Sequence, residues 1–126
     1  MSGNRYLLDT NCIINLLNGS SEDLLPKLKD AGWIGISIIS HLEFLSFPGL
    51  SERDKKLFYK FLDRINVVGL SENNLELINK ILEIRKNSNV KLPDSIILAT
   101  AEQMDAELLT RDKQLLNISG FNIKLY

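Results

Sequence analysis

The chain has 126 residues, of which 44% are hydrophobic and 25% charged, and its net charge is -1. This length supports one ordinary hydrophobic core and is too short for two. The composition excludes a largely disordered chain, and no apolar run approaches the roughly 20 residues of a membrane helix. We therefore expect a soluble, cytoplasmic protein with no membrane partner. It should form a single domain over residues 1–126, with residues 1–5 as a loose N-terminal end.

The first part of the chain predicts two short strands and two helices. An apolar run over residues 6–8 ends at Asp9, and helical spacing then continues to Leu17. A second helix is expected over residues 20–30, because its first residues are good helix caps and a glycine follows its end. Residues 33–37 are typical of a short buried strand.

The next segment predicts two helices with capping signals. Ser40 and Glu43 have the spacing of a capping box, which predicts a helix that opens at Ser40 and ends near Pro48. Residues 51–54 repeat the capping pattern. Apolar side chains at helical spacing over residues 57–65 then indicate an amphipathic helix.

The last half of the chain continues the alternation of strands and helices. Residues 66–69 predict a strand, and residues 72–87 predict a helix with Leu75, Ile78 and Leu82 facing inward. Pro93 suits the first turn of the next helix, because its missing N–H costs nothing there. Residues 96–104 carry that helix. The last strand candidates are residues 107–110 and 121–125.

Short apolar strands that alternate with helices favour an α/β fold with a mostly parallel central sheet, flanked by helices on both faces. In such folds, ligands bind outside the carboxyl ends of the strands. Acidic residues that follow strands or open helices are therefore the first candidates for a functional site.

Four acids hold such positions, although each also has a structural interpretation. Asp9 could cap the first helix, and Asp112 could be a cap or a turn residue after Thr110. Glu43 could belong to a capping box, and Asp94 could interact with a helix dipole. Taken together, four carboxylates at one sheet edge would repel one another, and hard oxygen ligands suit Mg²⁺ or Mn²⁺. A bound cation would remove that conflict.

Four sequence motifs carry a family resemblance that spans residues 6–125. They are Leu7-Leu8-Asp9-Thr10-Asn11, Ile39-Ser40-His41-Leu42-Glu43, the segment 93–101 that begins Pro93-Asp94-Ser95, and Leu109-Thr110-Arg111-Asp112. In order and spacing they resemble the motifs of PIN-domain nucleases, especially the VapC-type toxins of toxin–antitoxin pairs. Each motif alone is weak, and the four in order form a strong joint signal.

The resemblance implies a PIN-like parallel sheet, a Mg²⁺ or Mn²⁺ site on Asp9, Glu43, Asp94 and Asp112, and endonucleolytic hydrolysis of RNA. Toxins of this branch are often dimeric and are inhibited by a cognate antitoxin that enters the active-site groove. A homodimer and an antitoxin are therefore expected partners, beside the RNA substrate.

Metal-assisted hydrolysis also suggests roles for individual residues. Asp9 and Asp94 are the best candidates for direct metal ligands, with Asp112 completing the site and Glu43 holding the attacking water. Short polar side chains beside these acids could orient the carboxylates by hydrogen bonds; they are Thr10, Asn11 and Thr110. Asn11 and Thr110 are equally compatible with plain turns.

Other functions have weaker support. A haloacid-dehalogenase-type phosphatase needs a second aspartate two residues after the first, where this chain has Asn11. A receiver domain needs an early acid pair that is missing. The serious alternative is a catalytically inactive PIN-like module that binds another protein. A single histidine, His41, argues against metal-free acid–base catalysis, and a surface or packing role is expected for it.

Basic residues are distributed unevenly. Residues 51–91 contain nine Lys or Arg and six acids, and the rest of the chain contains six and ten. Four basic side chains lie on the polar side of the helix expected after residue 51, where a solvated face is the default interpretation and an RNA-contacting face the alternative; they are Lys55, Lys56, Lys60 and Arg64. Arg111 could likewise reach a phosphate or remain in solvent.

Overall fold

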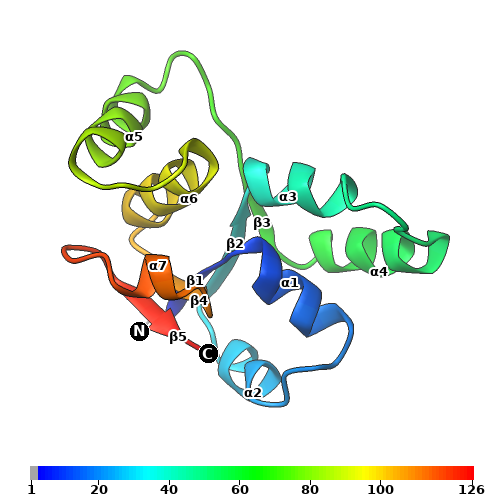
Figure 1. Ribbon diagram of the computed structural model, residues 1–126. Coiled ribbons are helices and arrows are strands. Elements are labelled where there is room, and N and C mark those ends of the chain that lie inside the picture. Colours follow the sequence, from blue (N-terminus) through cyan, green and yellow to red (C-terminus); the bar gives the residue numbers. More distant parts are fainter. Residues whose placement is uncertain (1–2) are drawn as a thin grey trace.

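A computed structural model describes residues 3–126 (Figure 1). Its strands are β1 (Arg5–Leu8), β2 (Trp33–Ser37), β3 (Asn66–Val68), β4 (Glu107–Thr110) and β5 (Ile123–Leu125). Its helices are α1 (Thr10–Leu17), α2 (Leu24–Lys29), α3 (Ile38–Leu45), α4 (Glu52–Leu62), α5 (Leu75–Asn87), α6 (Leu92–Gln103) and α7 (Lys113–Leu116). Of the expected loose N-terminal end, Met1 and Ser2 lie outside the described residues, and Arg5 already belongs to β1.

All strand pairs in the sheet are parallel, and the strand order is β3-β2-β1-β4-β5. The predicted α/β fold is therefore confirmed. β1 lies at the centre, where Leu7 pairs with Gly35 of β2 and with Leu108 of β4. Because the strands are parallel, the carboxyl ends of β1, β2 and β4 lie at one edge of the sheet. Strand order reverses at β1, and ligands bind at such a point in folds of this kind.

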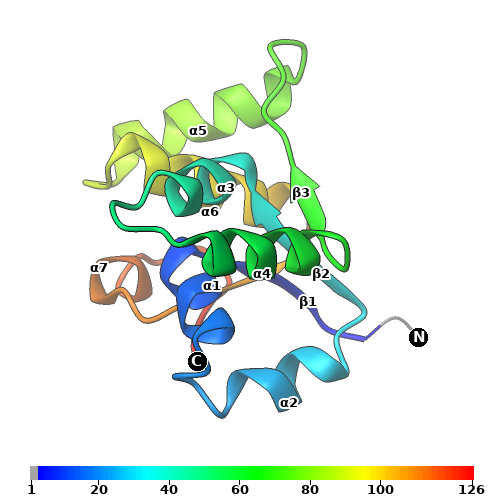
Figure 2. The same cartoon turned by 90° about the vertical axis from the view of Figure 1, so that its right-hand side faces the viewer.

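Helices cover both faces of the sheet (Figures 1 and 2). Successive side chains of a strand point to opposite faces, so Leu7 packs with α5, α6 and α7, whereas Leu8 packs with α1 to α4. Both leucines are fully buried. Two apolar cores therefore hold the sheet rigidly between the helix layers.

The buried face of α5 differs from the predicted one. Leu77, Ile81 and Ile84 are buried against α6, whereas Leu75 and Leu82 are 66% and 58% exposed. Both sets have helical spacing, and burial against α6 selects the first. The prediction that Leu75 and Leu82 face inward is wrong.

The start of α3 also differs from prediction. Ser37 is the N-cap, and its hydroxyl accepts a hydrogen bond from the backbone N–H of Ile39 at 3.1 Å. Ser40 lies inside the helix and is buried, so it forms no capping box with Glu43. Glu43 is thereby free of a capping role. Two apolar residues directly after β2 lengthen the helix beyond the predicted boundary.

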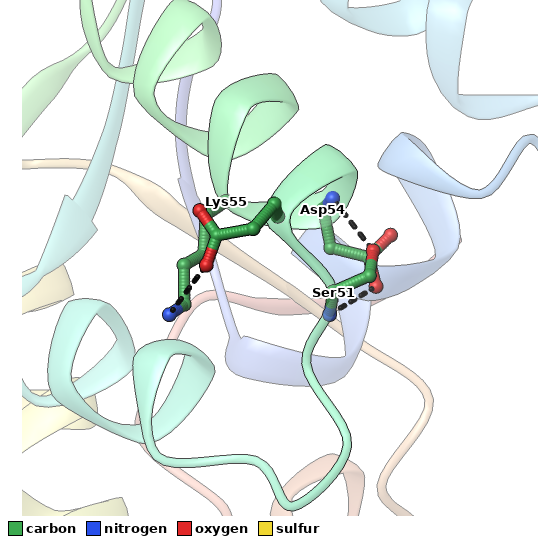
Figure 3. Close-up of polar contacts among 4 residues, drawn as sticks. Ser51, Asp54 and Lys55 are labelled. Carbon is green, nitrogen blue, oxygen red and sulfur yellow. Dashed lines mark hydrogen bonds and ion pairs between the residues drawn. The ribbon is translucent and has the colours of Figure 1, made fainter.

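Two further helix starts show how capping decides boundaries. The predicted cap of α4 is confirmed: Ser51 Oγ accepts the Asp54 N–H at 3.0 Å, and the Asp54 carboxylate accepts the Ser51 N–H at 3.3 Å (Figure 3). α2 begins later than expected, after Asp23, which makes no side-chain capping bond.

Among the described helices, none is long and apolar enough to cross a bilayer.

Candidate active site

Asp9 is the residue between β1 and α1, and it is 6% exposed. Its Oδ1 accepts the backbone N–H of Cys12 at 2.7 Å, and its Oδ2 accepts the hydroxyl of Thr110 at the end of β4. Burial raises the pKa of Asp9 above the ordinary 3.8. The two hydrogen bonds oppose that rise, and the charges of Asp112 and Asp94 add to it. Asp9 is thus both a helix cap and a member of an acid cluster.

Asp94 and Asp112 stand at the starts of two other helices. Asp94 is half-buried in the first turn of α6. Burial raises the pKa of Asp94, the charges of Asp112 and Glu43 raise it further, and Lys91 opposes the rise. Asp112 precedes α7, and its Oδ1 accepts the backbone N–H of Gln114 at 2.9 Å.

Glu43 reaches the same region from the opposite helix layer. It is exposed on α3, and its Oε1 accepts the hydroxyl of Thr10 at 2.6 Å. Thr10 is the first residue of α1, so this bond links α1 to α3. Thr10 and Thr110 therefore each hold one carboxylate, as expected for residues that orient acids.

A single pocket of about 370 Å³ brings the four acids together. They come from four parts of the chain: the end of β1, α3, the start of α6 and the end of β4. The pocket is lined by Asp9, Thr10, Asn11, Glu43, Ser46, Phe47, Asp94, Ile97, Asp112 and Leu115. All four predicted acids, and Thr10 and Asn11 beside them, therefore share one hollow at the carboxyl edge of the sheet.

The four carboxylates of this pocket are the type of ligand found in sites for hard metal ions. Four carboxylates offer hard oxygen ligands, which suit Mg²⁺ or Mn²⁺ better than softer metals. Within residues 3–126, however, no three acidic, histidine or cysteine side chains stand close enough to share an ion. Carboxylates repel one another, so a shared cation would draw them closer than repulsion leaves them. The chemistry of the donor set fits a hard cation, and the acids would move closer together to share one.

Several pocket residues were missed by the sequence interpretation. Ser46 and Phe47 follow α3, Ile97 lies one turn after Asp94, and Leu115 lies in α7. The short helix α7 was itself missed, although Asp112 before a Lys-Gln-Leu-Leu segment is an N-cap signal that could have indicated it. Phe47 carries no comparable sequence signal.

Two other residues from the sequence analysis, Arg111 and His41, have structural contacts. Arg111 donates to the Tyr126 carbonyl and to Ser21 Oγ, both at 3.2 Å, and its guanidinium lies 4.4 Å from the Tyr126 ring centroid. Two nitrogens of the Arg111 guanidinium, Nε and Nη2, are thus bonded to residues that do not line the acid pocket. His41 packs edge-on against Phe58 at 5.4 Å, as expected for a packing role.

The chain matches the family model described as PIN domain over residues 6–120. It belongs to the PIN domain family. Among curated protein sequences, none matches the chain. Family membership confirms the resemblance carried by the four motifs.

Solved structures with the same fold provide a second comparison. The PIN domain is similar to a chain of VapBC2 from Rickettsia felis bound to a promoter DNA fragment, with a TM-score of 0.81, 21% identity, and coverage of 97% of this chain and 98% of the other. It is also similar to a chain of a toxin–antitoxin complex from Klebsiella pneumoniae, with a TM-score of 0.75, 27% identity, and coverage of 94% and 95%. A third match is DNA-bound VapBC from Salmonella typhimurium, with a TM-score of 0.78, 20% identity, and coverage of 97% and 98%.

Proposed function

We propose that this PIN domain is a Mg²⁺- or Mn²⁺-dependent endoribonuclease and the toxin of a VapC-type toxin–antitoxin pair. The observation that carries the proposal is the single pocket that four carboxylates from separate elements line. Burial and, to a lesser extent, neighbouring acids raise the pKa values of Asp9 and Asp94, so ionising these carboxyls is unfavourable without a counter-charge, which a divalent cation would supply.

The positions of the four acids and the two threonines suggest a separate role for each. A divalent cation, when bound, supplies a nucleophilic water at neutral pH and neutralises charge on the phosphate. Asp9 and Asp94 would hold it directly, and Asp112 would complete the site. Glu43 is the most exposed of the four acids and would orient the attacking water. The Thr10 hydroxyl, which donates to the Glu43 carboxylate, would hold Glu43 in position for this role. Thr110 would fix the rotamer of Asp9.

Cleavage assays test the enzymatic part of the proposal. We expect the purified protein to cut RNA only with Mg²⁺ or Mn²⁺, to stop when chelator is added, and to leave a 5′-phosphate, because metal-activated water attacks phosphorus. The Asp94→Asn variant is the control for contaminating nucleases. RNA cleavage that persists in excess chelator would contradict the metal mechanism.

The alternative function is a protein-binding module with an inactive acid pocket. Thermal melting during a titration with Mn²⁺ separates the two functions, because a metal site stabilises the folded state as it fills. A protein that neither melts higher with metal nor cleaves any RNA would be the binding module.

An antitoxin partner is supported by the toxin–antitoxin complexes among the similar structures. We expect the product of a neighbouring gene to bind the PIN domain and block the acid pocket with its carboxy-terminal segment. Co-purification and loss of cleavage on mixing would support this; a protein that the host tolerates freely and that co-purifies with nothing would count against it. The expected homodimer stays a prediction, which sedimentation equilibrium tests.

A further inference from the structure

Phe47 lies between the acid pocket and a second hollow. It follows the end of α3, is 41% exposed, and lines both the acid pocket and a mainly apolar groove of about 360 Å³. The groove runs between α1 and α4 and includes Leu17 and Leu57. A strand that leaves the acid pocket on this side must therefore pass the Phe47 ring.

The Phe47 ring stands on a fixed aromatic base. Its centroid lies 6.5 Å from that of Phe44, with the rings at 89°, and Phe44 stacks on Phe58 at 4.2 Å with the rings at 16°. Phe44 and Phe58 are 4% and 0% exposed. Phe47 is therefore an exposed aromatic supported by the core, which suits a flat ligand because little side-chain freedom is lost on binding.

A stripe of basic side chains lies along α4, the helix that contributes Asp54 and Leu57 to the groove. Arg53, Lys56 and Lys60 are exposed and follow helical spacing. Arg53 and Lys60 lie four residues before and three residues after Leu57, which lines the groove. Within residues 3–126, these three cations form no ion pair.

The neighbouring charges on α4 are already engaged. Asp54 is bound in the capping box with Ser51, and Lys55 pairs with Glu52 at 3.4 Å (Figure 3). The basic stripe thus offers positive charge beside a pocket whose own charge is negative. A polyanion that reaches the acid pocket needs such a source of attraction, because the whole chain has a net charge of -1.

We propose that Phe47 stacks against an unpaired base next to the scissile phosphate of the RNA, and that Arg53, Lys56 and Lys60 hold phosphates of the same strand. This inference rests on the proposed endoribonuclease function. Stacking requires an exposed base face, which a duplex hides, and stacking platforms flanked by basic side chains are the usual means of binding single strands.

Binding measurements test Phe47 separately from cleavage. In chelator and on an Asp94→Asn background, a fluorescent single-stranded RNA should bind about 5- to 150-fold more weakly to the Phe47→Leu variant, the range expected for one lost base stack. Phe47→Trp should restore affinity. Tyr59→Leu is the matched control, because Tyr59 is a 52% exposed aromatic on α4 that lines neither hollow. Fully paired RNA of the same sequence should bind weakly and ignore the Phe47 change.

Salt titrations test the basic stripe. Replacing Lys56 and Lys60 with Gln should reduce the slope of log affinity against log salt by about 0.7 for each phosphate contact removed. Lys55→Gln is the control, since Lys55 already pairs with Glu52, and should leave the slope unchanged.

Two results would overturn the inference while leaving the proposed nuclease intact. The first is a wild-type chain that cleaves RNA with metal, although Phe47→Leu and the two lysine changes alter neither affinity nor salt slope. The second is a Phe47→Leu variant that binds RNA normally but changes from dimer to monomer, which would assign the groove to a second copy. Failure of the wild-type chain to cleave any RNA would instead contradict the proposed function.

Discussion

Asp9 and Asp94 line the same pocket but are held in different ways. Asp9 is buried where two strands end, and both of its oxygens accept hydrogen bonds, from Cys12 and Thr110. Asp94 is half-buried in the first turn of α6, and its side chain makes no hydrogen bond within residues 3–126. Asp9 is therefore fixed by hydrogen bonds to the backbone and to Thr110, whereas Asp94 interacts with its neighbours only through charge.

The difference separates structural from chemical contributions. Removing the charge of Asp9 also disturbs the junction of β1, α1 and β4, because an amide leaves one of the two donors, Cys12 N–H or the Thr110 hydroxyl, without its acceptor. Removing the charge of Asp94 relieves repulsion from Asp112 and Glu43 without breaking a hydrogen bond. Asp94 is therefore the cleaner probe of the proposed metal site.

The largest expected effect is the loss of cleavage in Asp94→Asn. Residues that only support metal ligands typically account for 10- to 100-fold, so loss of a direct ligand should reduce cleavage by more than about 100-fold. The metal-free variant should be as stable as the original or more stable, because an amide keeps the shape and removes a repelled charge.

Melting both proteins with and without metal completes this test. Mg²⁺ or Mn²⁺ should raise the melting temperature of the original protein much more than that of Asp94→Asn. If the variant unfolds without metal, and if metal stabilises both proteins equally, Asp94 is a structural residue of the helix start and the site assignment is wrong.

A smaller effect on metal binding is expected from Thr110→Val, which acts through Asp9. Valine keeps the shape of threonine and removes the hydroxyl that donates to Asp9 and accepts the Asp112 N–H. Metal affinity should fall about 10- to 100-fold, as for other residues that orient ligands. Thr110→Ser retains the hydroxyl and should bind metal nearly normally. Equal metal affinity for the valine and serine variants, measured by calorimetry, would show that the hydroxyl is dispensable.

Stability without metal should distinguish Asp9→Asn from Asp94→Asn. Both substitutions remove one charge, but an asparagine at position 9 offers one acceptor oxygen to two donors, which leaves a buried group unsatisfied. We expect Asp9→Asn to be less stable than Asp94→Asn by about 1–2 kcal/mol. Urea unfolding of both variants measures the difference, and equal stabilities would mean that the hydrogen bonds of Asp9 contribute little.

The fold and the acid pocket could be predicted because they depend on simple regularities. Apolar runs that end at polar residues marked β1, β2 and β4, and the carboxyl ends of parallel strands must meet at one edge. Asp9 follows β1 directly and Asp112 lies two residues after the end of β4, so their proximity followed from the topology. Asp94 and Glu43 required the family motifs, since their helices could have packed at other angles.

The errors arose where two local patterns were equally good. Serine is a common capping residue and occurs at both 37 and 40, and only packing after β2 makes Ser37 the cap and places the start of α3 at Ile38. In α5, the residues 75, 78 and 82 and the residues 77, 81 and 84 both have helical spacing, and only contact with α6 distinguishes them. The place of Phe47 depends entirely on tertiary contacts, so no sequence pattern predicts it.

The smallest expected effect is a pH dependence that should be present in the metal-free original protein and weaker in Asp94→Asn. The pKa of Asp94 is raised above its ordinary value of 3.8 by burial and by Asp112 and Glu43. Below pH 3.8 the group is protonated in both folded and unfolded chains and has no effect. As pH rises from there through the folded pKa, the folded chain retains the proton longer, so stability falls, and it remains lower at neutral pH.

The asparagine variant cannot lose that proton, so its stability relative to the original protein should increase as pH rises from about 4 to 7, by an amount set by the Asp94 shift. Asp9 contributes the same sign in both proteins, and subtracting the two unfolding curves largely removes its effect. Saturating Mn²⁺ should reverse the trend in the original protein, because a cation favours ionised carboxylates. A difference between the two proteins that stays constant across this pH range would mean that Asp94 ionises as readily in the folded chain as in the unfolded one. The repulsion on which the metal assignment depends would then be absent.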